Sequence, residues 1–175
     1  MDTADTIVAI ATPAGAGGIG VIRISGPDAL QIAGRVFTTA SGSNDFASHR
    51  THFGRLLHPD TRDHIDDVLM TSFHAPRSYT GEDVVELCCH GGTWAVRQAL
   101  RLCLEAGASP AGPGEFTRRA FLNGKMDLAQ AEGVMDLIGA KGEAALRAAL
   151  SIREGSLSRQ ADGFSQILLE HSSHI

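Results

Sequence analysis

Two charged side chains interrupt segments that are otherwise typical of buried β-strands. Residues 21–25 alternate so that Arg23 projects from the opposite face to its two isoleucine neighbours. In residues 84–90 the same alternation separates Glu86 from the valine and the leucine beside it. Because burying a carboxylate without a partner is unfavourable, Glu86 must meet a cation or a set of N–H donors. The sequence leaves two interpretations open: an ion pair with Arg23 or another base, and contact with a ligand that carries N–H groups.

A second concentration of charge lies further along the chain. Residues 113–125 bring together three cations, Arg118, Arg119 and Lys125, directly after a turn rich in Pro and Gly. Such a turn marks a joint between domains, where ligand sites tend to form. The alternative is the solvated face of a helix, which is the commoner place for such charges.

The run Gly15–Gly20 matches the GxGxxG pattern of dinucleotide-binding proteins. That pattern requires a helix directly after the glycines and an acidic residue about 20 positions further on. Here a predicted strand follows, and no Asp or Glu lies between Asp28 and Asp45. The run is therefore interpreted as a glycine hairpin, or as a backbone that a flat ligand can approach closely. No GxxxxGK[ST] motif is present, so we predict that this chain is not a P-loop nucleotide hydrolase by itself.

The histidines and cysteines match neither a metal site nor a nucleophile motif. The four histidines within residues 49–64 have no cysteine or second ligand pair at metal-binding spacing. Neighbouring strand residues face opposite sides, so Cys89 and His90 are not expected to work as nucleophile and base. We predict no metal site and no catalytic residue in this chain.

The rest of the sequence predicts an α+β fold. β-Branched residues and alternation indicate strands at residues 6–11, 21–25, 51–57, 68–74 and 84–90, with the third and fourth forming a hairpin. Helices are expected at about residues 26–37, at 94–106 with Thr93 as N-cap, at 115–122, and from 127 onward. We predict a mixed sheet with flanking helices over residues 1–124, followed by the start of an all-α helical domain over 125–175.

Composition narrows the function classes. The chain has 175 residues, 43% apolar and 20% charged, which is typical of a globular protein. Its formal charge of −5 argues against general binding to a phosphate backbone. Three cysteines cannot supply a disulfide framework. No apolar stretch approaches the roughly 18 residues of a membrane span, and the acidic start does not match an export signal, so a cytoplasmic location without membrane contact is expected.

Three long strings resemble one known family. They are DTIVAIATPAGAGGIGVIRISG from Asp5, SYTGEDVVELCCHGG from Ser78, and PGEFTRRAFLNGKMDLAQAE from Pro113 with VMDLI after it. Together, over about residues 5–158, they are similar to the N-terminal portion of the tRNA modification GTPase family known as MnmE or TrmE.

The resemblance implies a folate-binding and dimerising α+β domain, similar to tetrahydrofolate-binding domains, that leads into a helical domain. The family's GTPase domain, which uses GTP, potassium and magnesium, is absent from this chain. Family members form homodimers through this N-terminal domain. With an FAD-dependent partner of the MnmG or GidA kind, they install an aminomethyl-type group at C5 of the wobble uridine U34 of tRNA, using a methylene carbon from tetrahydrofolate.

By motif position, the family's folate-contacting residues correspond to Arg23, Glu86 and Lys125. The expected ligand is 5-formyl- or 5,10-methylene-tetrahydrofolate. A pteridine edge offers adjacent N–H and NH2 donors that Glu86 can accept, while Arg23 and Lys125 can meet a carbonyl oxygen or the glutamate tail. Two competing functions are a dimerisation scaffold without ligand, in which the same charges form structural ion pairs, and a free-standing one-carbon transferase, for which we identify no general base.

Overall fold

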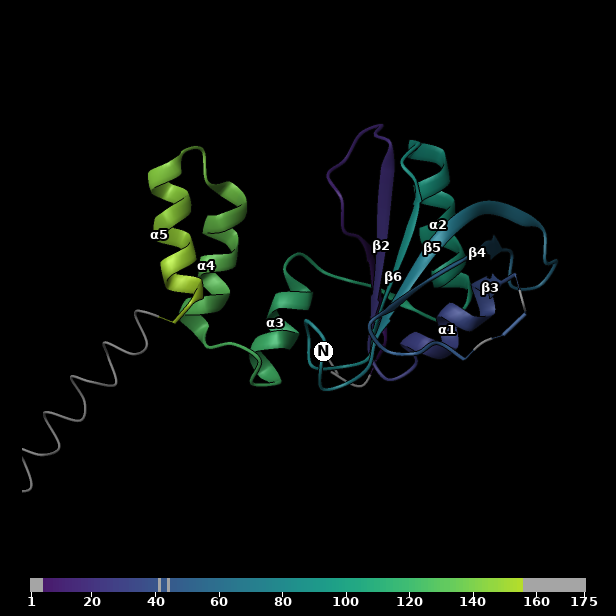
Figure 1. The fold of residues 1–175 in the computed structure, drawn as a ribbon, viewed down its shortest axis with the longest axis horizontal. Coiled ribbons are helices and arrows are strands. Elements are labelled where there is room, and N and C mark those ends of the chain that lie inside the picture. The colour runs from purple at the N-terminus through teal and green to yellow at the C-terminus, as the bar shows by residue number, and fades with distance from the viewer. Residues whose placement is uncertain (1–4, 41, 44, 156–175) are drawn as a thin grey trace, which may run out of the picture. The chain divides into compact units, whose positions relative to one another are not determined.

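The computed structural model describes residues 5–40, 42–43 and 45–155, which form two compact units (Figure 1). The first unit ends at Arg119 and the second begins at Ala120, within a helix that the sequence places before the predicted domain boundary at residue 124. Each unit is described separately below. The predicted helices beyond residue 155 lie outside the described residues.

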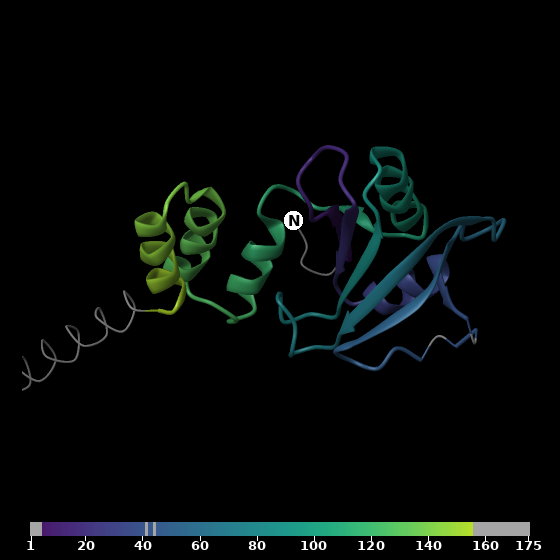
Figure 2. The same ribbon diagram turned by 45° about the horizontal axis from the view of Figure 1, so that its top comes forward.

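A seven-stranded mixed sheet forms the centre of the first unit, which confirms the predicted α+β class. Its spatial order is β3-β4-β5-β6-β2-β1-β7, and every neighbouring pair is antiparallel except β1 and β7. The strands are β1 Ile7–Ile10, β2 Ile19–Ser25, β3 Phe37–Thr39, β4 Arg50–Leu57, β5 His64–Phe73, β6 Val84–His90 and β7 Ser109–Pro110. The predicted hairpin of β4 and β5 is present, and Figure 2 shows these two strands as the longest ribbon of the sheet.

Two helices cover one face of this sheet and enclose the core. They are α1, Ala29–Val36, and α2, Thr93–Glu105. Ile22 and Ile24 of β2 are fully buried in this core, and so is Leu87 of β6. The alternation within β2 and β6 therefore points Arg23 and Glu86 to the opposite face of the sheet, as predicted.

Short elements account for most differences from the sequence prediction. β3 has three residues and follows α1 without a turn, while β7 has two residues, one of them Pro110. β7 pairs with β1 through the amides on either side of this proline, since Ser109 N donates to Thr6 O and Ala111 N donates to Val8 O. A proline thus occupies a sheet edge where no N–H is needed.

The prediction that Thr93 caps α2 was wrong. The N-cap is Gly92, whose backbone is extended, and Thr93 is the first helical residue. No side chain caps this helix, and Thr93 instead lines a cavity beside the glycine loop.

The second unit contains a helical hairpin. Helix α3, Glu115–Leu122, carries the junction between the units, and α4, Leu128–Gly139, and α5, Glu143–Arg153, follow it. Asp127 and Gln130 form a capping box at the start of α4. The two helices approach closely at Gly133, where an added Cβ would lie 3.0 Å from Ile152 Cγ2. None of the described helices has the length and hydropathy that a membrane span requires.

Candidate functional site

Arg23 and Glu86 meet on the sheet face that α1 and α2 leave open. They are cross-strand partners on β2 and β6, 63 residues apart in the chain. Arg23 Nε and Nη2 both contact the same carboxylate oxygen, Glu86 Oε1, at 2.8 and 2.7 Å. The other oxygen, Oε2, accepts no hydrogen bond from any described residue. Since the two side chains keep 28% and 30% of their surface exposed, this second oxygen is available to an incoming donor.

Two aromatic rings stand beside this ion pair. The Arg23 guanidinium carbon lies 5.3 Å from the centre of the Tyr79 ring and 5.7 Å from that of Phe116. Tyr79 comes from the turn before β6 and Phe116 from α3, and the two segments are joined by a 2.8 Å hydrogen bond between the Tyr79 hydroxyl and Thr117. We call Tyr79 and Phe116 the aromatic walls of the site. Their rings offer a surface on which a flat heterocycle can stack.

Arg119 occupies the interior next to these walls, with 1% of its surface exposed. Its Nη2 contacts Asp5 Oδ1 at 2.6 Å and Glu115 Oε1 at 3.2 Å, and its Nη1 contacts Glu82 Oε1 at 3.3 Å. Burial lowers the pKa of Arg119, but hydrogen bonds to Asp5 and Glu115 and the charge of Glu82 raise it, and the net shift is upward. The guanidinium therefore remains charged inside the protein.

Side-chain oxygens of Ser25, Thr80 and Glu82 extend the hydrogen-bond network of Arg119. Ser25 Oγ donates to Glu82 Oε2 at 2.7 Å and lies 2.7 Å from Thr80 Oγ1. Ser25 and Thr80 are fully buried, and Ser25 is two residues from Arg23 on the same strand face. The turn that carries Tyr79 is thus fixed to β2 by side-chain hydrogen bonds.

The register of the strands arranges the open sheet face in rows. One row passes from Thr71 through Glu86 to Arg23. The next row is apolar and crosses four strands, because Phe53 pairs with Leu69, Leu69 with Cys88, and Cys88 with Val21. Phe53 and Leu69 are 63% and 45% exposed, and we call these four residues the apolar row.

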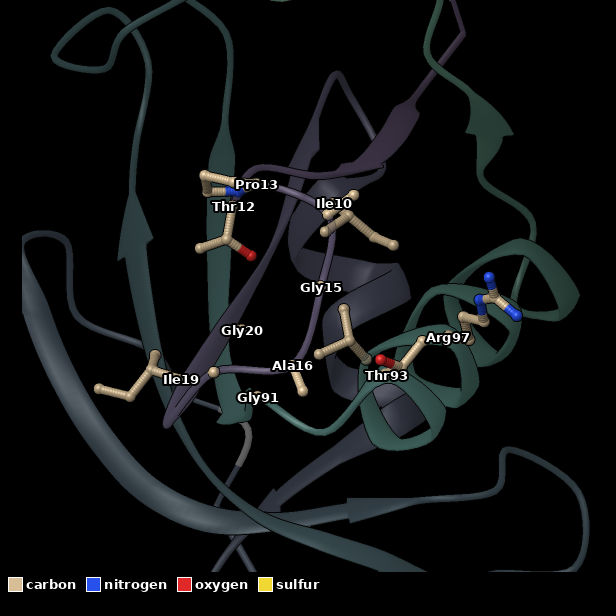
Figure 3. A pocket seen from close by; sticks show the side chains of 13 residues that line it. Ile10, Thr12, Pro13, Gly15, Ala16, Ile19, Gly20, Gly91, Thr93 and Arg97 are labelled. Carbon is tan, nitrogen blue, oxygen red and sulfur yellow. The ribbon is translucent and has the colours of Figure 1, made fainter.

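A separate cavity of about 400 Å3 lies beside the glycine loop (Figure 3). Its lining combines residues 12–17 with Ile10 and with Thr93, Val96 and Arg97 of α2. Two backbone hydrogen bonds hold this loop against Gly91. Gly17 N donates to the oxygen of Gly91, and Gly91 N donates to the oxygen of Gly18. The glycine run therefore connects two strands and does not begin a helix. This cavity contains neither Arg23 nor Glu86.

Lys125 belongs to the second unit, whereas Arg23 and Glu86 belong to the first. Within its own unit it borders a cavity of about 210 Å3 together with Gln130, Val134 and Arg153. Its assignment to the same site as the first two residues remains a prediction.

Cys89 of β6 and Cys103 of α2 are buried packing residues. Burial raises the pKa of Cys89 and Cys103 to about 12, so both thiols stay protonated at neutral pH. His90 faces away from Cys89, and its Nδ1 donates a 2.6 Å hydrogen bond to Asp66 Oδ1, which raises the pKa of His90. His64 similarly pairs with Asp67 at 3.0 Å.

Comparison with known proteins assigns the chain to a family. Residues 6–125 match the family model described as the GTP-binding protein TrmE N-terminus. The chain belongs to this TrmE N-terminal family. The resemblance noted from the three strings is thereby confirmed, and the match extends over the whole sheet and over α3.

Curated relatives agree with this assignment. The chain is 52% identical over 168 residues to a protein named tRNA modification GTPase MnmE from Geobacter metallireducens, covering 96% of this chain and 36% of that protein. It is 47% identical over 166 residues to the protein of the same name from Levilactobacillus brevis, covering 95% and 36%. For that from Symbiobacterium thermophilum the identity is 51% over 173 residues, covering 98% and 38%. The chain thus spans little more than a third of the length of these TrmE relatives.

Proposed function

We propose that this chain binds a reduced folate, 5-formyl- or 5,10-methylene-tetrahydrofolate, at Arg23 and Glu86. The observation that carries the proposal is the Glu86 carboxylate, which is partly exposed, held by Arg23 through one oxygen, and open to a donor at Oε2. A pteridine ring presents adjacent N–H and NH2 donors, which match a carboxylate acceptor. The walls formed by Tyr79 and Phe116 supply the stacking surface for such a ring.

The cations take the other polar parts of the ligand. Arg23 keeps N–H donors beyond the two that contact Glu86, and these suit a carbonyl oxygen of the folate. Lys125 is proposed to meet the glutamate tail, whose carboxylates attract an ammonium group.

We further propose that the whole protein acts in tRNA modification as a GTPase, as the names of its relatives suggest. In this proposal the folate supplies the methylene carbon of an aminomethyl-type group at C5 of U34, and an FAD-dependent partner of the MnmG or GidA kind takes part, in the cytoplasm. GTP, potassium and magnesium would be bound outside this chain, whose sequence has no GxxxxGK[ST] motif. The chain's own task is to hold the folate.

The apolar row supports the proposal of a homodimer. Phe53 and Leu69 are large side chains exposed side by side on the open face of the sheet, where a second copy could bury them. A dimerisation scaffold without ligand is the second candidate function. It is favoured by one observation, namely that Arg23 and Glu86 already satisfy each other's charge.

Calorimetric titration of the 175-residue chain with 5-formyltetrahydrofolate separates these functions. The proposal predicts saturable binding that is weakened in Arg23→Gln and retained in Arg118→Gln, a change at an exposed arginine of α3. A chain that sediments as a dimer and releases no heat with the folate would support the scaffold instead.

A further inference from the structure

We infer that Arg119 is a positioning residue that holds the two aromatic walls, Tyr79 and Phe116, in place beside Arg23. Arg119 is buried, and both of its Nη atoms donate to oxygens of other residues, so it does not itself present a group on the open sheet face. Its role follows from which segments it ties together.

Each segment that presents a wall to Arg23 also presents a carboxylate to Arg119. Helix α3 carries Phe116 and, directly before it, Glu115, which lies 3.2 Å from Arg119 Nη2. The turn before β6 carries Tyr79 and, three residues later, Glu82, which lies 3.3 Å from Arg119 Nη1. Arg119 is itself a residue of α3, so its contact with Glu82 ties the helix that carries Phe116 to the turn that carries Tyr79.

A third contact fixes this assembly to the sheet. Arg119 Nη1 donates to the backbone oxygen of Asp5 at 2.7 Å, and Nη2 contacts the Asp5 carboxylate at 2.6 Å. Asp5 stands two residues before β1, which pairs with the strand that carries Arg23. The position of the aromatic walls is thus fixed relative to β2, the strand that carries Arg23.

The contacts of Arg119 require the several N–H donors that a planar guanidinium presents in a fixed arrangement. Two Nη atoms reach three carboxylates and one carbonyl oxygen on three different segments. Lysine keeps the positive charge that three surrounding carboxylates need, but its single ammonium cannot reach all of these oxygens with the same geometry. Arg119→Lys should therefore preserve the fold and loosen the walls.

This inference rests on the proposed function for its ligand, but its first test does not use a ligand. The chain has one tyrosine, so labelling with 3-fluorotyrosine gives a single fluorine resonance that reports on Tyr79. We expect Arg119→Lys to shift or broaden this resonance, while the matched control Arg118→Lys, at the exposed neighbour on α3, leaves it unchanged.

The second test measures affinity for 5-formyltetrahydrofolate in a double-mutant cycle. Because the change loosens an aromatic contact with the ligand, Arg119→Lys should weaken binding roughly two- to twelvefold. In a Phe116→Leu background, which lacks one wall, the same change should weaken binding less. A purely structural role would lower the melting temperature equally in both backgrounds and would not produce this coupling.

The outcomes are separable. An unchanged fluorine resonance in a folded Arg119→Lys protein overturns the inference, and so does a loss of affinity that is equal in both backgrounds. If the wild-type chain does not bind the folate, the proposed function fails, while the fluorine result still decides the role of Arg119. Should Arg119→Lys not fold, Glu82→Gln applies both tests, because it weakens the tie between α3 and the turn that carries Tyr79 and keeps the buried arginine.

Discussion

Replacing Glu86 by glutamine should separate ligand binding from stability. The side chains of Arg23 and Glu86 are each more than a quarter exposed, so their ion pair is well screened by solvent. Exposed pairs contribute about 0–1 kcal/mol, and the amide oxygen of the introduced glutamine can still accept from Arg23. For a chain of this size, the melting temperature should fall by no more than about 2–4 °C.

The effect on folate affinity should be much larger. Glutamine replaces one acceptor oxygen by an NH2 donor, which would face the N–H and NH2 donors of the pteridine ring. Hydrogen bonds to a charged group contribute about 1.5–3 kcal/mol each, and a factor of ten in affinity is about 1.4 kcal/mol. We therefore expect Glu86→Gln to weaken 5-formyltetrahydrofolate binding by roughly 10- to 100-fold.

Calorimetry and thermal melting of the same samples measure both quantities. The matched control is Asp67→Asn on β5, which removes a carboxylate from an exposed ion pair with His64. This control should change neither the affinity nor the melting temperature by much. If Glu86→Gln binds the folate as tightly as the control does, Glu86 is not part of the site and its pairing with Arg23 is structural.

Three further predictions concern packing, protonation and association. Gly54→Ala should lose at least about 1–3 kcal/mol of stability in chemical denaturation, because its Cβ would lie 2.2 Å from a β3 carbonyl oxygen, whereas Gly18→Ala, with nothing within 4 Å, should stay near wild type. Burial raises the pKa of Cys89 and Cys103 to about 12, against an ordinary 9.0. Their contribution to stability is therefore complete below pH 9.0 and is lost as pH rises toward 12. Chemical denaturation at a series of alkaline pH values would show this loss as a falling midpoint. Leu69→Asp places a charge in the apolar row and should convert a dimer to a monomer in sedimentation, and an unchanged dimer would remove that row from the interface.

The regular elements could be predicted because their patterns repeat. β2 and β6 alternate over seven residues each, and α2 shows a helical period over thirteen. β3 and β7 have three and two residues, too few for any period, and they exist only because a neighbouring strand supplies their hydrogen bonds. Their pairing depends on the tertiary fold, which no local pattern contains.

The candidate site was predictable in part for a similar reason. A charge inside an apolar strand violates the local pattern, and this singled out Arg23 and Glu86. Tyr79 and Phe116 lie in a turn and a short helix, where an aromatic residue breaks no pattern, so their place beside Arg23 was not predicted.

Arg119 shows most clearly what the sequence could not predict. In the sequence it is one of two adjacent arginines, and a solvated helix face describes Arg118 correctly, since that residue is exposed. The one local signal was Glu115, four residues earlier, which is the spacing of an ion pair on a helix. Contacts with Asp5 and Glu82, 114 and 37 residues away, bury the charge and could not be inferred from that spacing.

The most direct test of the folate proposal is an experimental structure of the chain with 5-formyltetrahydrofolate. We predict the pteridine ring on the open face of the sheet, with its donors on Glu86 and its plane against Tyr79 or Phe116. A pteridine ring in the glycine-loop cavity beside Val96, with the Arg23–Glu86 pair untouched, would contradict the proposal.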